Sequence, residues 1–403
     1  MPPIKDDVKP HNKLSVIEFT LMLALMVSMS AMSTDMMLPA LGTIGENLDA
    51  PSQNSPQLII SAILLGLTFG QILYGPLSDS FGRRPLVFAG FGIFMLGTLI
   101  CIFANSFNSL LAGRLLQGLG AAGPRVVSTS IIRDLYAGRE MAKILSIMMS
   151  FFIIVPAIAP AIGQFILSIA SWREIFYVLF ASSFMSLIWF GFRQSETLKP
   201  EYRRIFSVKL ILSGFAEVAK IRICLLGTIM AGLMMGAFYG FLMSSPQVFA
   251  KNYGVTDKFP LYFAILALCC GLATVVNAKL VLRLGMRRLC KFALLLKCAT
   301  SFGLLILLIN SATIPLNLFV VWACLVFFVH GFLFGNFNAM AMEPVGHLAG
   351  VGAAFVATLS SGLAVAIGTL IGQSYNGTII PLVASFAGLA ITSLIIMKLT
   401  PTP

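Results

Sequence analysis

Charged residues are scarce in this chain, and their scarcity excludes an ordinary water-soluble protein. Asp, Glu, Lys and Arg together make up 10% of its 403 residues, whereas a soluble domain carries about 25%. Hydrophobic residues supply 58% of the sequence, so soluble domains built from it would lack the polar residues that cover a surface. A lipid bilayer removes that requirement, because it solvates apolar side chains directly.

Residue types that form catalytic and metal centres are also few. The three His residues, His11, His330 and His347, are widely separated in the sequence. The seven Cys residues have neither metal-ligand spacing nor a disulfide pattern. We therefore expect no metal, no other cofactor and no enzymatic activity.

Long apolar runs are what the sequence has in abundance. A membrane-spanning helix needs about 20 apolar residues, and a series of such runs follows the N-terminus. They lie near residues 16–42, 54–76, 86–105, 108–131, 142–169, 172–192, 221–249, 259–282, 287–310, 315–342, 350–374 and 378–399. Uninterrupted runs favour helices over strands. The predicted fold class is an all-α polytopic membrane protein with twelve transmembrane helices.

A polar stretch divides the chain into two similar halves. We assign residues 1–192 to an N-terminal six-helix bundle, 193–220 to a cytoplasmic linker and 221–403 to a C-terminal six-helix bundle. Gly82 precedes an Arg pair in the link after the second run, and Gly285 precedes another 203 residues later, after the eighth. This repeat predicts two pseudo-symmetric bundles with a solute site between them.

The net charge of +12 is distributed as in a membrane protein. Basic residues collect in alternate links between the runs, and only Arg173, Lys251 and Lys258 fall in the other set of links. Short cytoplasmic links are rich in Lys and Arg, so both termini are predicted to be cytoplasmic. We expect a monomeric multi-pass protein of the inner (plasma) membrane whose partners are lipid, protons and a small-molecule substrate, not nucleic acid.

The link after the second run contains five residues that we call the latch. It reads Gly-Pro-Leu-Ser-Asp-Ser-Phe-Gly-Arg-Arg-Pro, and the latch residues are Gly75, Asp79, Gly82, Arg83 and Arg84. The glycines permit turns, and Asp79 can accept hydrogen bonds from a helix end or from an Arg. Such a latch would hold one conformation and break in another; the alternative is a basic turn without a gating role. The stretch resembles the cytoplasmic signature of the major facilitator superfamily.

The fourth run carries two Arg residues, Arg114 and Arg125, together with Gln117. An intramembrane Arg costs at least ~2.5 kcal/mol on insertion scales, so it requires a counter-charge or a water-filled cavity. Eleven residues return to within about 20° of the same helix face, roughly 16 Å along the axis. The alternatives are a structural Arg114 bonded to backbone and an Arg125 that snorkels to the interface. The run resembles the helix-4 signature of proton-coupled members of that superfamily.

Asp35 is the one acidic residue that lies well inside a predicted span. Desolvation favours the protonated form of a carboxyl group, and a nearby cation favours the ionised form. Asp35 is therefore predicted to gain and lose a proton during transport. The alternatives are permanent pairing with a polar neighbour or a side chain that reaches the outer interface.

The fifth run contains Pro156, Pro160 and Gly163. The prolines remove helix hydrogen bonds, and Gly163 lets a neighbouring helix approach. The run resembles the antiporter motif Gly-Pro-x-x-Gly-Gly of proton-driven exporters, with Ala159 and Gln164 in place of two glycines. A kinked helix without a role in coupling is the alternative.

Four further residues complete the set of candidates. Glu343 and His347 follow the tenth run and are predicted to form a cytoplasmic pair. Tyr239 and Asn338 join Arg114, Gln117 and Arg125 as candidates for the substrate cavity. Lys297 lies inside the ninth run, where snorkelling is the simplest interpretation.

Together these motifs make the chain similar to the bicyclomycin-resistance/CflA group of drug:proton antiporters. The likeness extends from the Asp35 motif, through Trp172 and Arg173, to Asn338. It implies the major facilitator fold, with Asp35 as the carboxylate for proton and substrate and Arg114 as the residue that tunes it. We expect export of small amphipathic drugs in exchange for protons. The alternatives are a dedicated exporter of an anionic or zwitterionic metabolite or siderophore, which Arg125 suggests, and a channel.

Overall fold

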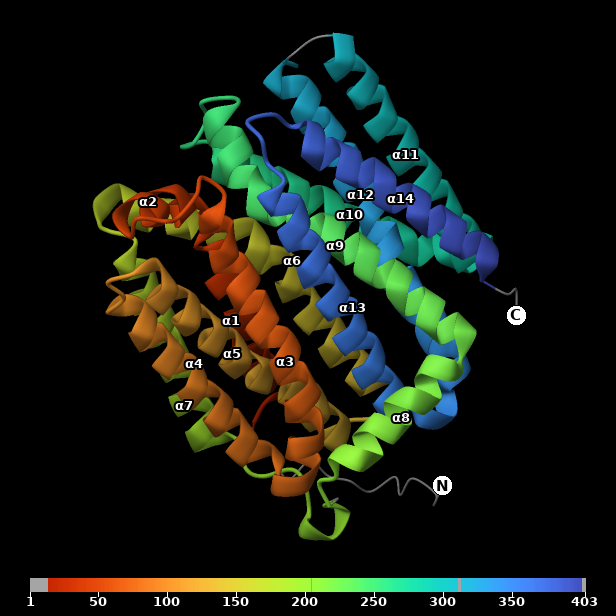
Figure 1. Cartoon of the computed structure of the whole chain (residues 1–403). Coiled ribbons are helices and arrows are strands. Elements are labelled where there is room, and N and C mark those ends of the chain that lie inside the picture. The colour runs from red at the N-terminus through yellow and green to blue at the C-terminus, as the bar shows by residue number, and fades with distance from the viewer. Residues whose placement is uncertain (1–13, 204, 311–312, 401–403) are drawn as a thin grey trace.

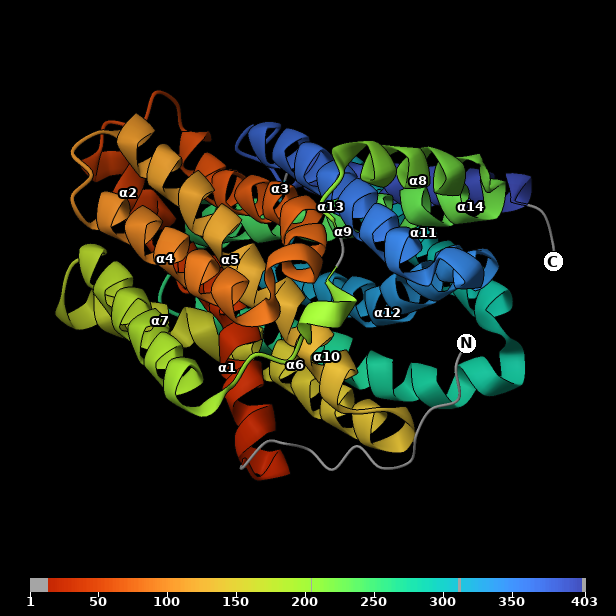
Figure 2. The same cartoon turned by 90° about the horizontal axis from the view of Figure 1, so that it is seen from below.

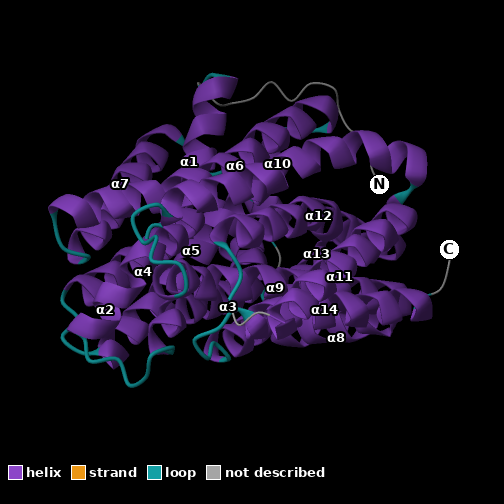
Figure 3. Ribbon diagram, turned by 90° about the horizontal axis from the view of Figure 1, so that it is seen from above, coloured by secondary structure: helices purple, strands orange, loops and turns teal. Residues whose placement is uncertain are grey.

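The protein is a bundle of long helices, and no strand occurs among the residues that the structure describes (Figures 1 and 3). The structure is a computed structural model that describes residues 14–203, 205–310 and 313–400, without the side chains of 149, 152, 153, 210, 310 and 347–349. The long helices are α1 (Val16–Asp35), α3 (Leu58–Phe81), α4 (Arg83–Ile102), α5 (Phe107–Leu135), α6 (Gly138–Ile169), α7 (Arg173–Arg193), α9 (Arg222–Lys251), α10 (Phe259–Leu284), α11 (Met286–Asn310), α12 (Leu316–Met342), α13 (Ala349–Gln373) and α14 (Ile380–Leu399). Each coincides with one predicted span.

Shorter helices connect them. The connecting elements are η1 (Leu38–Ala40), α2 (Leu41–Asn47), η2 (Ser55–Gln57), η3 (Pro200–Tyr202), α8 (Val208–Lys220) and η4 (Glu343–Leu348). We use α2 and α8, which lie at opposite ends of the bundle in Figure 1, to name its two ends. The predicted linker thus contains a helix, α8, whose Val218 is buried and whose Phe215 packs edge-on against Phe355 of α13.

Ten helical segments in the described residues are long and apolar enough to cross a membrane. Helix α5 is not among them, because it contains Arg114, Gln117, Arg125 and Arg133. Helices α3 and α4 both pack along α5, and the Arg114 and Gln117 side chains are fully buried. Arg114 and Gln117 are therefore shielded from lipid by protein.

Backbone geometry shows the repeat directly. Gly82 separates α3 from α4 with φ +106°, and Gly285 separates α10 from α11 with φ +76°. Both glycines adopt positive φ, which side chains resist. Gly75 was expected to permit a turn as well, and that expectation is wrong: it lies inside α3, which continues through Pro76 to Phe81.

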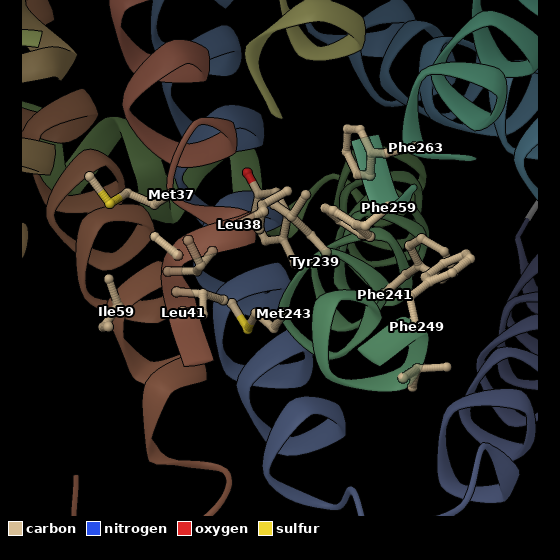
Figure 4. Packing of buried hydrophobic residues seen from close by; sticks show 14 of the residues in the cluster. Met37, Leu38, Leu41, Ile59, Tyr239, Phe241, Met243, Phe249, Phe259 and Phe263 are labelled. Carbon is tan, nitrogen blue, oxygen red and sulfur yellow. The ribbon is translucent and has the colours of Figure 1, made fainter. Parts of the chain in front are cut away.

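The two halves meet along two helix pairs. Helix α3 lies beside α13, and α6 lies beside α10 (Figures 1 and 2). A continuous apolar core also links the halves near the α2 end, where Leu38 and Leu41 share a cluster with Tyr239 and Met243 of α9 (Figure 4). This packing places the end of α1 at the boundary between the halves.

Candidate functional site

Asp35 is the last residue of α1, and the helix ends there because Pro39 follows four residues later. Pro39 has no N–H with which to continue the helix onto the Asp35 carbonyl, and the chain turns into η1 instead. The Asp35 residue is 6% exposed. No hydrogen bond or ion pair joins its carboxyl group to another of the described residues, so permanent pairing with a neighbour does not describe this state.

Gly163 of α6 packs against this break in α1. A Cβ atom at Gly163 would lie 2.1 Å from the backbone oxygen of Met36, which is far too close. Only glycine therefore allows α6 to approach the residue that follows Asp35. Pro156 and Pro160 lie within α6, which remains one helix from Gly138 to Ile169.

Arg114 is held by oxygen atoms on several helices. Its guanidinium donates to the Ser33 carbonyl of α1 at 2.9 Å and to the Ile59 carbonyl of α3 at 3.3 Å. It also donates to Oε1 of Gln117 at 2.6 Å, and Gln117 Nε2 donates to Thr98 Oγ1 of α4 at 2.9 Å. This arrangement matches the structural alternative for Arg114. The Ser33 carbonyl belongs to the last turn of α1, where carbonyls lack helical partners.

Tyr239 of α9, in the other half, lies within electrostatic range of Arg125 and, separately, of Asp35. Tyr239 is 7% exposed and Arg125 is half-buried. The Tyr239 phenol is therefore placed to sense charge on both α1 and α5 of the opposite half.

Asn338 is not bound into this group. Its side-chain amide donates back to the Phe334 carbonyl of its own helix, α12, at 3.0 Å. Asn336, two residues earlier, donates instead to Oδ1 of Asn277 on α10 at 2.8 Å. The sequence analysis missed this link because an Asn at either position fits the same helix.

The latch forms a network of charges inside the N-terminal half. Arg83 pairs with Asp79 at 2.5 Å and with Asp134, at the end of α5, at 2.9 Å. Asp134 Oδ2 also accepts from Thr197 Oγ1 at 3.0 Å. Arg83 therefore ties the end of α3 to the end of α5.

Glu196 completes the latch, although the sequence analysis did not single it out. Its carboxylate accepts the backbone N–H groups of Arg83 and Arg84, at 2.9 and 3.0 Å. A negative charge at these first N–H groups of α4 is favourable because they have no helical acceptors. Gly82 is favoured beside it because its φ is +106°, and a Cβ atom there would lie 2.6 Å from Glu196 Oε2, so that the carboxylate would have to shift.

The predicted pair after α12 remains a prediction. Glu343 is exposed at the start of η4. The side chain of His347 lies outside those that the structure describes.

Five residues at the α2 end, Asn54, Gln57, Gln247, Gln373 and Tyr375, hold the halves together; we call them the clasp. Gln57 Nε2 donates to Gln247 Oε1 at 2.7 Å, and Gln247 Nε2 donates to Asn54 Oδ1 at 3.2 Å. Asn54 Nδ2 donates to the carbonyls of Gln373 and Tyr375, at 3.0 and 2.8 Å. All of these groups are uncharged, so the clasp does not depend on ionic strength.

A cavity of about 550 Å³ lies at the α2 end, over the clasp. Both halves line it, with Pro39, Glu46 and Asp49 from one and Lys251 and Phe259 from the other. Gln57 and Gln247 line it as well, so their hydrogen bond forms part of its wall. Hydrogen bonds between the halves gather at this end. Besides those of the clasp, Gln247 Nε2 donates to the Gln53 carbonyl, Ser61 Oγ donates to the Met243 sulfur, and Thr369 Oγ1 donates to Ser61 Oγ.

Comparisons with known proteins agree with this architecture. An uncharacterized MFS-type transporter of Bacillus subtilis, YdgK, is 30% identical over 361 residues, which cover 87% of each chain. The bicyclomycin resistance protein homolog of Haemophilus influenzae is 26% identical over 94% of this chain and 95% of that one. Multidrug resistance protein D of Escherichia coli is 26% identical over 90% and 91%.

Solved structures show the same fold. A D-xylose–proton symporter superposes with a TM-score of 0.77 at 15% identity, covering 96% of this chain and 98% of that one. The human organic anion transporter MFSD10 superposes with a TM-score of 0.71 at 16% identity, covering 96% and 100%. The family model described as Major Facilitator Superfamily matches residues 23–369. With twelve helices in two pseudo-symmetric bundles, the chain is a multi-pass membrane transporter that belongs to the major facilitator superfamily.

Proposed function

We propose that the protein exports small amphipathic solutes in exchange for protons, and that Asp35 couples the two movements. The observation that carries this proposal is the position of Asp35, buried at the break of α1, within electrostatic range of Tyr239 of the other half and without an ion-pair partner among the described residues. A carboxyl in such a place is stable when it binds a proton or a cationic solute. Competition between the two at one group would couple their fluxes.

Alternating access of the two halves would supply the movement. We assign residues 1–192 and 221–403 to the two moving bundles and the α8 end to the cytoplasm, because the basic links lie at that end. The clasp then closes the outer side, and the cavity above it is the outer vestibule. The latch contains only residues of the N-terminal half and its linker, so it would keep α3, α4 and α5 in register while the bundles rock.

The names of the relatives support efflux of drugs. One is called a bicyclomycin resistance protein homolog and another a multidrug resistance protein. We therefore favour bicyclomycin-like and cationic amphipathic compounds as the first solutes to test. The apolar core beside the site, where Tyr239 and Met243 of α9 lie next to Leu38 and Leu41 in Figure 4, suits such solutes.

Transport by purified protein in vesicles tests the proposal. Vesicles with an acidic interior should accumulate a labelled solute in exchange for protons, and an ionophore that collapses the pH gradient should abolish the accumulation. Protein-free vesicles control for passive trapping of weak bases. Saturable flux that is indifferent to the pH gradient would contradict proton exchange, and flux without saturation or counterflow would indicate a channel.

A second candidate is a dedicated exporter of an anionic or zwitterionic metabolite. Arg125 favours it, since its half-buried guanidinium lies within electrostatic range of Tyr239, as Asp35 does. Arg125→Ala should then weaken binding of carboxylate-bearing solutes by at least tenfold, while Arg133→Ala, on the exposed end of α5, should not. Equal affinity of Arg125→Ala and the wild type for every anionic solute would remove this candidate.

A further inference from the structure

Lys297 of α11 is fully buried inside the C-terminal half. Snorkelling to the interface was the simplest interpretation of the sequence, and it is wrong. The Nζ atom lies 3.7 Å from the sulfur of Met234 on α9 and 4.7 Å from the ring centre of Phe386 on α14. Among the described residues, no oxygen atom accepts a hydrogen bond from Nζ and no carboxylate pairs with it.

The N-terminal half contains a buried cation in a different setting. Arg114 is equally buried, but it donates to the oxygens of Ser33, Ile59 and Gln117. Those oxygens stabilise a permanent charge, and Arg keeps its proton in proteins. A thioether and an aromatic face stabilise a charge much less, and a buried Lys readily loses its proton. The surroundings of Lys297 therefore accommodate both the amine and the ammonium.

The titratable neighbours of Lys297 can be named helix by helix. His330 on α12 is 6% exposed and lies within electrostatic range of Lys297. Cys270 on α10 and Cys298 on α11 are the other titratable groups that act on it. Helices α9 and α14 contribute the uncharged Met234 and Phe386. Since two nearby cations repel each other, Lys297 and His330 share one proton more readily than they hold two.

His330 also connects this group with the candidate site. Its ring stacks on Phe238 of α9, with ring centres 5.7 Å apart and planes 24° apart. Phe238 is followed by Tyr239, which lies within electrostatic range of Asp35 and of Arg125. A movement of α9 that changes the surroundings of Asp35 would therefore also change those of His330.

We propose that Lys297 and His330 form a second protonation site of the transporter, in the half opposite Asp35. In one conformation the lone pair of the Lys297 amine or of the His330 imidazole takes a proton from water on one side of the membrane. In the other conformation the same N–H bond breaks and the proton returns to water on the opposite side. The predicted effect on protons exchanged per solute rests on the proton exchange proposed above. The protonation of Lys297 itself does not depend on that proposal.

Trp322 provides a readout of Lys297 that needs no transport. Its indole packs edge-on against Phe386, with ring centres 5.5 Å apart, and Lys297 lies over that same Phe386 ring. In a protein with Trp172→Phe and Trp189→Phe, Trp322 fluorescence should change with pH between about 5 and about 10. Lys297→Met should abolish the transition, and Lys291→Met, at an exposed position of the same helix, should keep it.

A flux measurement then tests the role in the cycle. Protons exchanged per solute, measured from reversal potentials in vesicles, should fall by about one when both groups of the site are replaced, in Lys297→Met combined with His330→Gln; Lys297→Gln takes the place of Lys297→Met if the Met variant melts early. An unchanged proton stoichiometry would overturn the proposal. A Trp322 transition that persists in both Lys297→Met and Lys297→Gln would overturn it as well. If the wild type exchanges no protons at all, the proposed function fails, and the Trp322 titration still decides whether Lys297 binds a proton.

Discussion

Arg114 donates a hydrogen bond to the backbone carbonyl of Ser33, two residues before Asp35. The bond satisfies a carbonyl in the last turn of α1 and fixes the place where that helix ends. Arg114 therefore acts on the proposed coupling residue through the backbone, by position, and forms no ion pair with its carboxylate.

Replacing Arg114 should lower the stability of the folded protein and should not act on the proton dependence of transport alone. In Arg114→Met, the oxygens of Ser33, Ile59 and Gln117 lose their donor in a buried site. Unsatisfied groups of this kind cost about 1–3 kcal/mol each in proteins and less inside membranes, so we expect a loss of about 2 kcal/mol or more. Thermal unfolding in detergent measures it, with Arg133→Met, at an exposed position of the same helix, as the control that stays closer to wild type. A fully stable Arg114→Met that lost only proton dependence would contradict the structural role.

Much of this architecture follows from the sequence, and particular residues show why. The twelve helices were predicted because hydrocarbon imposes their length, and the Gly82 turn because its link combines glycine with Arg pairs. The sequence predicts a turn at Gly75, because a glycine followed by Pro76 is typical of a helix end. The structure instead continues α3 through both residues, and the sequence alone does not show the neighbouring helices that pack against it. Glu196 and the clasp escaped notice because their partners are more than a hundred residues away. The sequence motif around Arg114 does not tell whether its guanidinium binds a carboxylate or a backbone carbonyl. The packing of the helices determines which of the two acceptors it reaches.

Removing the carboxylate of Glu196 should loosen the start of α4. Glu196→Ala deprives the N–H groups of Arg83 and Arg84 of their acceptor, and loss of a helix cap costs about 0.5–2 kcal/mol. Glu201→Ala is the matched control in the same linker, because the ion pair of Glu201 with Lys199, at 3.9 Å, is exposed. Denaturation of the two variants in detergent should show the difference; equal stabilities would mean that Glu196 does not cap α4.

A methyl group at Gly163 should separate α6 from the break in α1. The Cβ atom would overlap the Met36 oxygen, and the helices would have to move apart. We expect Gly163→Ala to insert into the membrane and to be extracted in detergent as a folded protein, while its transport rate falls at least tenfold. Gly303→Ala, where the added atom meets nothing within 4 Å, is the control. Wild-type rates in both variants would show that this close approach is dispensable.

The clasp should set the balance between the two facing states. Gln247→Ala removes its hydrogen bonds to Gln57 and Asn54, each worth about 1 kcal/mol. The population open at the α2 end should therefore rise, at low and high salt alike. Spin labels at Asn47 and Asp257, exposed residues of the two halves, would report longer distances in the variant. An unchanged distance distribution would show that the clasp does not hold this end closed.

Replacement of Asp35 tests the central claim most directly. Asp35→Asn keeps the size of the side chain and removes its titration, so exchange of a labelled for an unlabelled uncharged solute across the membrane should continue. Accumulation driven by a pH gradient should be lost, together with the pH dependence of transport, in vesicles where the wild type shows both. If Asp35→Asn still accumulates solute at the wild-type level when the gradient is imposed, Asp35 is not the coupling residue.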